Sequence, residues 1–215
     1  SSNLNQNGSG SCITIGADDM TLDCSNFIME GDGSQSSYGI KAIGRTNVTI
    51  RNCRITHFTN AVLFQATNNS RLENNSASLS LDGFSFNSSI NNKIAGNSAY
   101  GSSISGFFID SSSNNILANN FAYNNVVDGF RIYYSSVNNT FENNSAYNNS
   151  NNGFSIGYLS NNATLANNLA YDNVNGFSTY GSDYITFTNN SAFNNSNYGF
   201  NIYSNFNNLA NNSAY

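Results

Sequence analysis

The sequence repeats with a period of about 23 residues, and this repeat restricts the fold more than any other feature of the chain. Each repeat is marked by a glycine that in most repeats precedes an aromatic residue. The markers are Gly39, Ala61 (in place of glycine), Gly83, Gly106, Gly129, Gly153, Gly176 and Gly199, spaced by 22, 22, 23, 23, 24, 23 and 23 residues. A period of this length is typical of solenoids, in which each repeat stacks on the next.

Three short strands are expected in every repeat. Phe130 alternates with Ile132, and Phe154 with Ile156, which is the period of two that places both side chains on one face of a strand. A second strand is marked by Ile50, Leu72, Ile94, Leu117, Phe141, Leu165, Phe187 and Leu209. A third is marked by Ile55, Ala77, Ala99, Ala122, Ala146, Ala170, Ala192 and Ala214. Asparagine and glycine clusters interrupt the chain too often for helical repeats.

A coil of three strands pairs each strand with the same strand one turn away, so residues at equivalent positions stack in columns. We expect one column of buried aromatic rings: Phe84, Phe107, Phe130, Phe154, Phe177 and Phe200. Paired asparagines are expected at the corners, because asparagine tolerates a left-handed backbone and its amide hydrogen-bonds to the asparagines above and below. The pairs begin at Asn74, Asn119, Asn143, Asn167, Asn189 and Asn211.

These motifs resemble a known family. The segments that carry the resemblance are Cys12-Ile13-Thr14-Ile15, Asp19-Met20-Thr21-Leu22-Asp23-Cys24, Gly31-Asp32-Gly33, Asn47-Val48-Thr49-Ile50-Arg51-Asn52-Cys53 and the later asparagine repeats. They are similar to the NosD-type (PbH1) repeats of exported archaeal and bacterial surface proteins, over essentially the whole chain. The resemblance implies a right-handed, pectate-lyase-like solenoid and a secreted, extracellular or cell-surface location. It says little about activity, because the fold hosts many functions.

The expected fold is therefore all-β: a single-stranded right-handed parallel β-helix of roughly eight to nine turns, with three short strands in each. One domain is expected over residues 1–215. Residues 1–38 would form an N-terminal turn with a longer loop, and residues 39–215 the regular repeats, the last one incomplete.

Composition restricts the partners. Only 9% of the residues are charged, against about 25% in ordinary domains, so asparagine and serine must cover the surface. Seven Lys and Arg against 12 Asp and Glu give a net charge of −5, without the basic patch that nucleic acid needs. No apolar run approaches the roughly 20 residues that span a bilayer. We therefore expect neither a nucleic-acid partner nor a membrane span.

No catalytic, cofactor or metal site is expected. Asp82 and Asp128 share the position before the glycine, but two turns separate them and Ser105 lies between, which suggests a half-built site. The copper binding implied by the NosD label needs several converging soft or imidazole ligands. His57 is the chain's one histidine, and the two methionines lie far from it in sequence. The sequence thus favours a protein without enzymatic activity, cofactor or metal.

Two kinds of covalent modification are candidates, a disulfide and N-glycosylation. Cys24 and Cys53 fall within one position of each other when the repeats are aligned, so adjacent strands bring them within disulfide range. Stacked free thiols are the alternative, and Cys12 is left over. Asn-x-Ser/Thr sequences make glycosylation candidates of Asn47, Asn74, Asn143, Asn162 and Asn189.

An aromatic stripe lies next to the third strand's small residue, at Tyr100, Tyr123, Tyr147, Tyr171, Phe193 and Tyr215. Alternation points these rings away from the core. They form either a local packing ladder or a flat surface for sugar rings or for a neighbouring protein.

The main functional interpretation is an extracellular structural protein that stacks head to tail into filaments. Its support is the apparent lack of a capping turn, which leaves strand edges and apolar columns open at both ends. Residues 1–28 of one subunit would contact residues 199–215 of the next, through Ile13, Ile15, Leu22, Leu209 and Ala214. The expected partner is then another copy of the chain, with surface polysaccharide or glycans as a second class of partner. The alternative is a carbohydrate-binding or polysaccharide-cleaving β-helix that uses the aromatic stripe.

Overall fold

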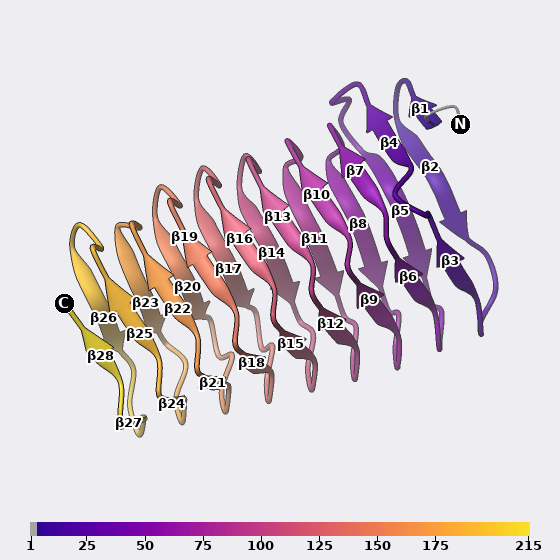
Figure 1. Cartoon of the computed structure of the whole chain (residues 1–215). Coiled ribbons are helices and arrows are strands. Elements are labelled where there is room, and N and C mark those ends of the chain that lie inside the picture. Colours follow the sequence, from indigo (N-terminus) through magenta and orange to yellow (C-terminus); the bar gives the residue numbers. More distant parts are fainter. Residues whose placement is uncertain (1–3) are drawn as a thin grey trace.

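The chain forms a right-handed parallel β-helix of about nine turns, whose turns stack in one row between the two termini (Figure 1). The computed structural model describes residues 4–215. Within that range three parallel sheets run the length of the solenoid, sheet A with ten strands and sheets B and C with nine each. No helix occurs in the described part of the chain, and so none that could cross a bilayer. The expected fold class is confirmed.

Each turn contributes one long strand and two short ones. Sheet A contains β1 (Leu4–Gln6), β4 (Ile28–Gly31), β7 (Arg54–Thr56), β10 (Ser76–Ser78), β13 (Ser98–Tyr100), β16 (Phe121–Tyr123), β19 (Ser145–Tyr147), β22 (Leu169–Tyr171), β25 (Ser191–Phe193) and β28 (Ser213–Ala214). Sheet B contains the long strands β2 (Gly10–Ile15), β5 (Ser37–Ile43), β8 (Asn60–Gln65), β11 (Asp82–Asn87), β14 (Ser105–Asp110), β17 (Asp128–Tyr133), β20 (Asn152–Gly157), β23 (Asn175–Tyr180) and β26 (Tyr198–Tyr203). Sheet C contains β3 (Thr21–Asp23), β6 (Thr49–Arg51), β9 (Arg71–Glu73), β12 (Lys93–Ala95), β15 (Ile116–Ala118), β18 (Thr140–Glu142), β21 (Thr164–Ala166), β24 (Thr186–Thr188) and β27 (Asn208–Ala210).

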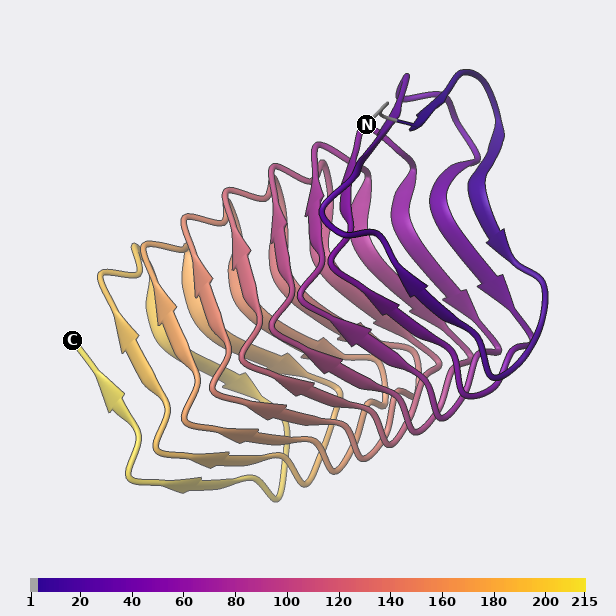
Figure 2. The ribbon, with the colours of Figure 1, turned by 45° about the vertical axis from the view of Figure 1, so that its right-hand side comes forward.

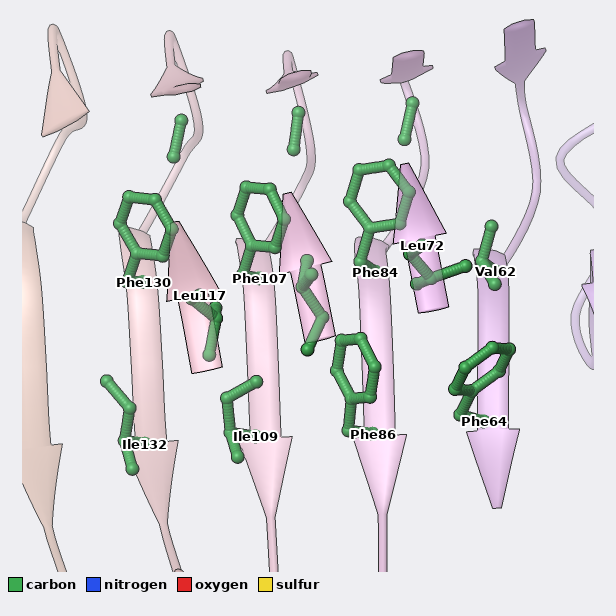
Figure 3. Packing of buried hydrophobic residues seen from close by; sticks show 14 of the residues in the cluster. Val62, Phe64, Leu72, Phe84, Phe86, Phe107, Ile109, Leu117, Phe130 and Ile132 are labelled. Carbon is green, nitrogen blue, oxygen red and sulfur yellow. The ribbon is translucent and has the colours of Figure 1, made fainter. Parts of the chain in front are cut away.

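The three sheets surround the axis of the solenoid (Figure 2), and buried apolar side chains fill the space between them. Sheet B supplies the phenylalanine column, in which ring centroids of successive turns lie 4.7 to 5.0 Å apart. Figure 3 shows Phe84, Phe107 and Phe130 in this column, with Leu72 and Leu117 of sheet C beside them. Outward residues alternate with these buried ones along each strand. Because the strands of sheet B are the longest, its outer face is the broadest of the three.

The marker glycines face the interior where sheet A meets sheet B. A Cβ on Gly129 would lie 2.7 Å from the carbonyl oxygen of Gly153 and 3.1 Å from the Ala146 Cβ. Close packing between turns, and not a positive φ, therefore requires glycine at this position. The strict alternation is interrupted at this position, because the glycine and the buried phenylalanine that follows it both face the interior.

Asparagine ladders hold the corners between the sheets. The Asn120 amide, for example, donates to the Asn144 Oδ1 at 3.0 Å, while its Oδ1 accepts the backbone N–H of Asn97 at 2.9 Å. The ladder between sheets C and A consists of Asn75, Asn97, Asn120, Asn144, Asn168, Asn190 and Asn212. A second runs between sheets A and B through Asn125, Asn149, Asn173 and Asn195. Buried turn amides are thus satisfied from one turn to the next.

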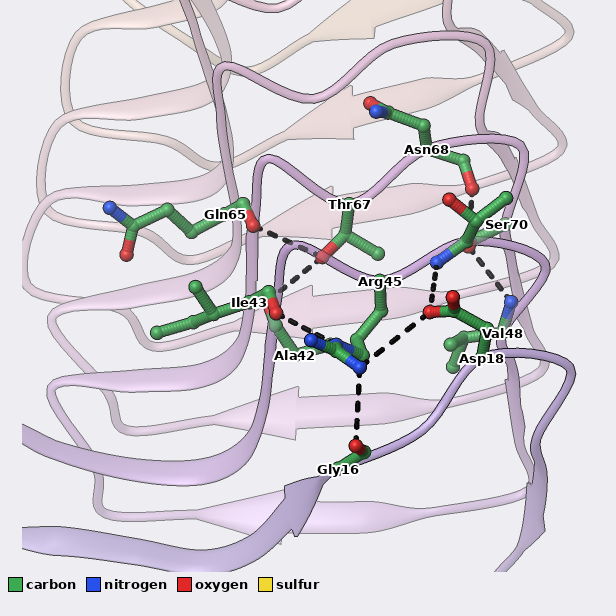
Figure 4. A network of polar contacts seen from close by, with 11 residues as sticks. Gly16, Asp18, Ala42, Ile43, Arg45, Val48, Gln65, Thr67, Asn68 and Ser70 are labelled. Atoms are coloured by element: carbon green, nitrogen blue, oxygen red, sulfur yellow. Dashed lines mark hydrogen bonds and ion pairs between the residues drawn. The ribbon is translucent and has the colours of Figure 1, made fainter.

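The first turns use other side chains for the same purpose. The Ser70 hydroxyl accepts the N–H of Val48 at 2.9 Å, and the Thr67 hydroxyl donates to the carbonyl of Ala42, also at 2.9 Å (Figure 4). Arg45 donates to the carbonyl of Gly16 at 3.2 Å, which ties the first turn to the second. Hydroxyl and guanidinium groups therefore replace amides where the asparagine pattern is irregular.

Candidate functional site

A row of polar residues opens the central strands of sheet B. It consists of Asp82, Ser105, Asp128, Asn152 and Asn175, the first residues of β11, β14, β17, β20 and β23. We call it the acidic row. Each member is buried and directly precedes a marker glycine. With neighbouring strands about 4.8 Å apart, the Cα atoms of the two aspartates, which are two strands apart, lie about 10 Å from each other.

Asp82 is 7% exposed, and its Oδ1 accepts the backbone N–H of Ser105 at 3.1 Å. Burial raises the pKa of the Asp82 carboxyl to about 6, because desolvation outweighs that hydrogen bond and the attraction of Arg131. A carboxyl group in this range exchanges protons near neutral pH, as general acid–base catalysis requires.

Asp128 is 2% exposed and is held by asparagines of the next turn. Its Oδ1 accepts the backbone N–H of Asn152 at 3.1 Å and the Asn152 amide at 2.8 Å, and the Asn151 amide at 3.2 Å. Burial also raises the pKa of Asp128 above its ordinary value, despite these bonds and the nearby Arg131. The acidic row therefore carries two carboxyl groups with raised pKa values.

Arg131 brings a positive charge to the same face. It points outward between the buried Phe130 and Ile132 of β17, and its guanidinium lies 4.4 Å from the ring centroid of Tyr133 and 5.3 Å from that of Phe108. Its Nε is buried and has no hydrogen-bond partner. The aromatic rings hold the guanidinium in place and leave part of its donor capacity for a ligand.

Two further groups of the acidic row lack partners. Asn175 Oδ1 is buried without a hydrogen bond, and Ser105 Oγ, between the two aspartates, makes none within bonding geometry but lies close enough to the Asp82 carboxyl to lower its pKa. Buried polar groups are usually satisfied, and a bound polar molecule is one explanation for such exceptions. Sequence reasoning considered Asp82 and Asp128 but missed Arg131. Its outward position between two core residues was the available signal.

A group of tyrosines lies at the other edge of the same face. Tyr133, Tyr134, Tyr158 and Tyr180 contact one another, with ring centroids 4.9 to 5.9 Å apart; we call them the tyrosine cluster. Burial and the neighbouring tyrosines raise the pKa of Tyr180. Beside the cluster is a shallow depression of about 470 Å³, lined by Ser111, Tyr134, Ser135, Tyr158 and Leu159. The sequence analysis missed this group.

The predicted aromatic stripe lies along sheet A. Its rings stack face to face, with centroids 4.9 to 5.9 Å apart and interplanar angles of 1 to 11°. The ring faces inside the stack therefore cover one another, and only edges and hydroxyls point outward. Sugars stack on ring faces, so the inner members of the stripe offer them little.

The remaining predicted sites lie away from the acidic row. Cys24 and Cys53 form a disulfide between neighbouring turns, and Cys12 is free. The five glycosylation candidates are exposed, with left-handed backbones: Asn47, Asn74, Asn143, Asn162 and Asn189. Glycosylation stays a prediction. No group of three potential metal ligands occurs among residues 4–215.

The residues predicted for head-to-tail assembly lie in the first and last turns. They are Ile13, Ile15, Leu22, Leu209 and Ala214. Ile15 is buried, Ile13 and Leu22 are half-buried, and Leu209 and Ala214 are exposed. Residues 1–3 of the proposed interface lie outside the described part of the chain. The assembly stays a prediction.

The family follows from comparison with known proteins. Residues 2–170 match the family described as right handed beta helix region, and the chain belongs to this family. The narrower likeness to NosD-type repeats stays a prediction. A search of curated protein sequences finds no match.

The solved structures that resemble the chain share its fold at low identity. The periplasmic alginate epimerase AlgG aligns with a TM-score of 0.76 and 16% identity over 87% of this chain and 50% of its own. The A-module of the mannuronan C-5 epimerase AlgE6 from Azotobacter vinelandii gives 0.68 and 20%, over 98% and 67% of the two chains. Pectate lyase Pel9A gives 0.65 and 18%, over 86% and 55%. The chain thus spans about half the length of AlgG.

The expectation that the chain is not an enzyme is corrected by these neighbours, which are polysaccharide epimerases and a lyase. The expectation rested on the separation of Asp82 from Asp128 by Ser105. It did not consider that the charge of Arg131 reaches both carboxyl groups and that burial raises both of their pKa values. The sequence argument counted carboxylates in one column and overlooked the arginine on the same face.

Proposed function

We propose that the chain binds a polysaccharide on the outer face of sheet B and modifies it by proton transfer at Asp82 and Asp128. One observation carries the proposal: two buried carboxyl groups with raised pKa values lie within electrostatic reach of Arg131, which points to the outer face of sheet B. Strongly perturbed carboxyl groups beside a specific charge partner are typical of functional sites. The polysaccharide-modifying neighbours support this interpretation over a filament subunit.

The arrangement suits a sugar that carries a carboxylate. Arg131 binds the carboxylate through its free donors and stabilises the negative charge that develops when the adjacent carbon loses its proton. Asp82, ionised above a pH of about 6, accepts that proton. Asp128 is the second proton-transfer group. Return of a proton to the opposite face of the carbon gives an epimer, whereas loss of the neighbouring glycosidic oxygen cleaves the chain and leaves a double bond.

Export is part of the proposal. The disulfide between Cys24 and Cys53 suits an oxidising compartment, and AlgG is described as periplasmic. We therefore place the protein in the periplasm or outside the cell, where acidic polysaccharides are accessible. The narrower NosD-type membership agrees with export and adds no residue to the site.

The test is an activity assay on defined polymers. Polymannuronate and polygalacturonate are incubated with the protein, and proton NMR follows epimer signals and the olefinic signal of an elimination product. We expect one polymer to react, and the variants Asp82→Asn, Asp128→Asn and Arg131→Gln each to lose at least about 100-fold in rate.

The matched control is Glu142→Gln, which neutralises an exposed carboxylate on sheet C and leaves sheet B intact. It should react like the parent. Inactivity of the parent on both polymers, or parental rates for the three sheet B variants, would overturn the proposal.

A further inference from the structure

Two adjacent turns after sheet B carry an extra residue. The serine that follows the strand comes six residues after the marker glycine in the turns of β11, β14 and β23, as with Ser112 after Gly106, but seven after it in the turns of β17 and β20. The longer turns hold Tyr134-Ser135 and Tyr158-Leu159, all four with φ between 54 and 65°. Bulky side chains are uncommon in this conformation, and such residues cluster at ligand sites.

The extra residues make a short stack of rings with one open end. Tyr134 and Tyr158 are parallel, with centroids 5.1 Å apart and an interplanar angle of 15°. Tyr180 of the next turn packs against Tyr158 in a T-shaped contact, with ring centroids 4.9 Å apart. On the near side the preceding turn has Ser111 where the next ring would be, so the depression lies against Tyr134.

We propose that this depression binds the ring of a pyranose, which stacks on Tyr134 above Ser111 and anchors the polysaccharide chain. The inference rests on the proposed function and deepens it. A sugar ring presents C–H groups on its face and hydroxyls at its rim, and the depression offers the matching pattern. Tyr134 and Tyr158 are 47% and 48% exposed, so their rings are accessible to a ligand.

Polar groups surround the aromatic face. The Asp110 carboxylate accepts the Ser111 hydroxyl at 2.8 Å, and Ser135 stands exposed on the opposite wall. These oxygens are partners for sugar hydroxyls. A charged carboxylate here disfavours a sugar acid, so the anchored unit presents hydroxyls at this position.

The anchor and the acidic row lie on one strand and its turn. From Asp128 to Tyr134 the chain advances six residues, or about 20 Å at the rise of an extended strand. Arg131 and Tyr133 face outward between them. A polysaccharide chain that contacts both ends therefore crosses sheet B along β17.

The experiment measures binding and turnover separately. Calorimetric titrations use hexasaccharides of mannuronate, galacturonate and glucose. Tyr134→Asn removes the ring but keeps a residue suited to a left-handed backbone, and Ser111→Tyr adds a ring over the open face. We expect each variant to weaken the best hexasaccharide at least about tenfold and to raise KM without lowering kcat. Tyr123→Asn in the stacked stripe is the matched control and should bind as the parent does.

The outcomes separate this inference from the proposed function. If the parent modifies a polymer and both variants keep its affinity and KM, the anchor is wrong while the function stands. If no polymer is modified but hexasaccharide binding is lost in both variants, the anchor stands and the proposed chemistry fails. Unaltered circular dichroism spectra for the variants show that a loss of binding is local.

Discussion

Replacing Asp82 by asparagine should stabilise the folded protein at neutral pH while abolishing its activity. The folded pKa of about 6 exceeds the ordinary value of 3.8, so the folded state binds more protons than the unfolded chain between these values. The group's contribution to stability is therefore complete below pH 3.8 and is lost as the pH rises through 6. The difference corresponds to about 3 kcal/mol at 1.36 kcal/mol per pKa unit.

The amide of the variant keeps the hydrogen bond that Asp82 accepts from the Ser105 N–H, since its Oδ1 occupies the same place. It loses the attraction of Arg131, which offsets part of the gain. We expect Asp82→Asn to be about 2 kcal/mol more stable than the parent at pH 7.5, and nearly as stable as the parent at pH 3.5. Urea unfolding, followed by circular dichroism across this pH range, measures the difference.

Asp32 supplies a control of opposite sign. Hydrogen bonds from Ser34 and Gly8 lower its pKa to about 2, so its contribution to stability is present above pH 3.8 and is lost as the pH falls through 2. Asp32→Asn should therefore destabilise the protein at pH 7.5. A destabilised Asp82→Asn at pH 7.5, or a stability difference that does not vary with pH, would refute the assignment of a raised pKa to Asp82.

Three further predictions concern the scaffold. Phe130→Ala should cost about 3–5 kcal/mol in the free energy of unfolding, because the fully buried ring, whose centroid lies 4.8 and 4.7 Å from those of the rings on either side, leaves a cavity. Tyr123→Ala removes a ring that is stacked in a similar way but half-exposed, and should cost less than half as much. Equal costs for the two variants would contradict the register. Gly129→Val should prevent folding or lower the urea midpoint sharply, since its Cβ would lie 2.7 Å from a carbonyl oxygen of the next turn; a parental midpoint would rule out this packing. Replacing Cys24 and Cys53 by serine should lower the free energy of unfolding by about 3–4 kcal/mol, because the unfolded chain regains the entropy of a loop closed over 29 residues. An unchanged unfolding curve would count against this bond.

The fold was predictable because a solenoid repeats its constraints in every turn. The spacing of the glycines and the alternation around Phe130 identified the buried columns, and the structure confirms them as stacked strands. The site was harder to predict, because it departs from the repeat. Arg131 stands where neighbouring turns have Phe108 and Ser155, and nothing in one column indicates that it reaches carboxylates in another. The longer turn at Tyr134 was visible only as one extra residue.

The acidic row and the asparagine ladders act in opposite directions on stability. Each ladder amide bonds to the neighbouring turns, and because a carboxamide does not titrate, its contribution to stability does not depend on pH. Asp82 and Asp128 instead favour their protonated forms when folded, and they weaken the fold where they are ionised. A repeat that stabilises every turn in the same way can hold two such residues in its central turns. Their raised pKa values are hard to explain as scaffold, because Asn152 stands in the same row with its amide and its oxygen both hydrogen-bonded and carries no ionisable group. We therefore attribute the two buried carboxyl groups to chemistry on the outer face of sheet B.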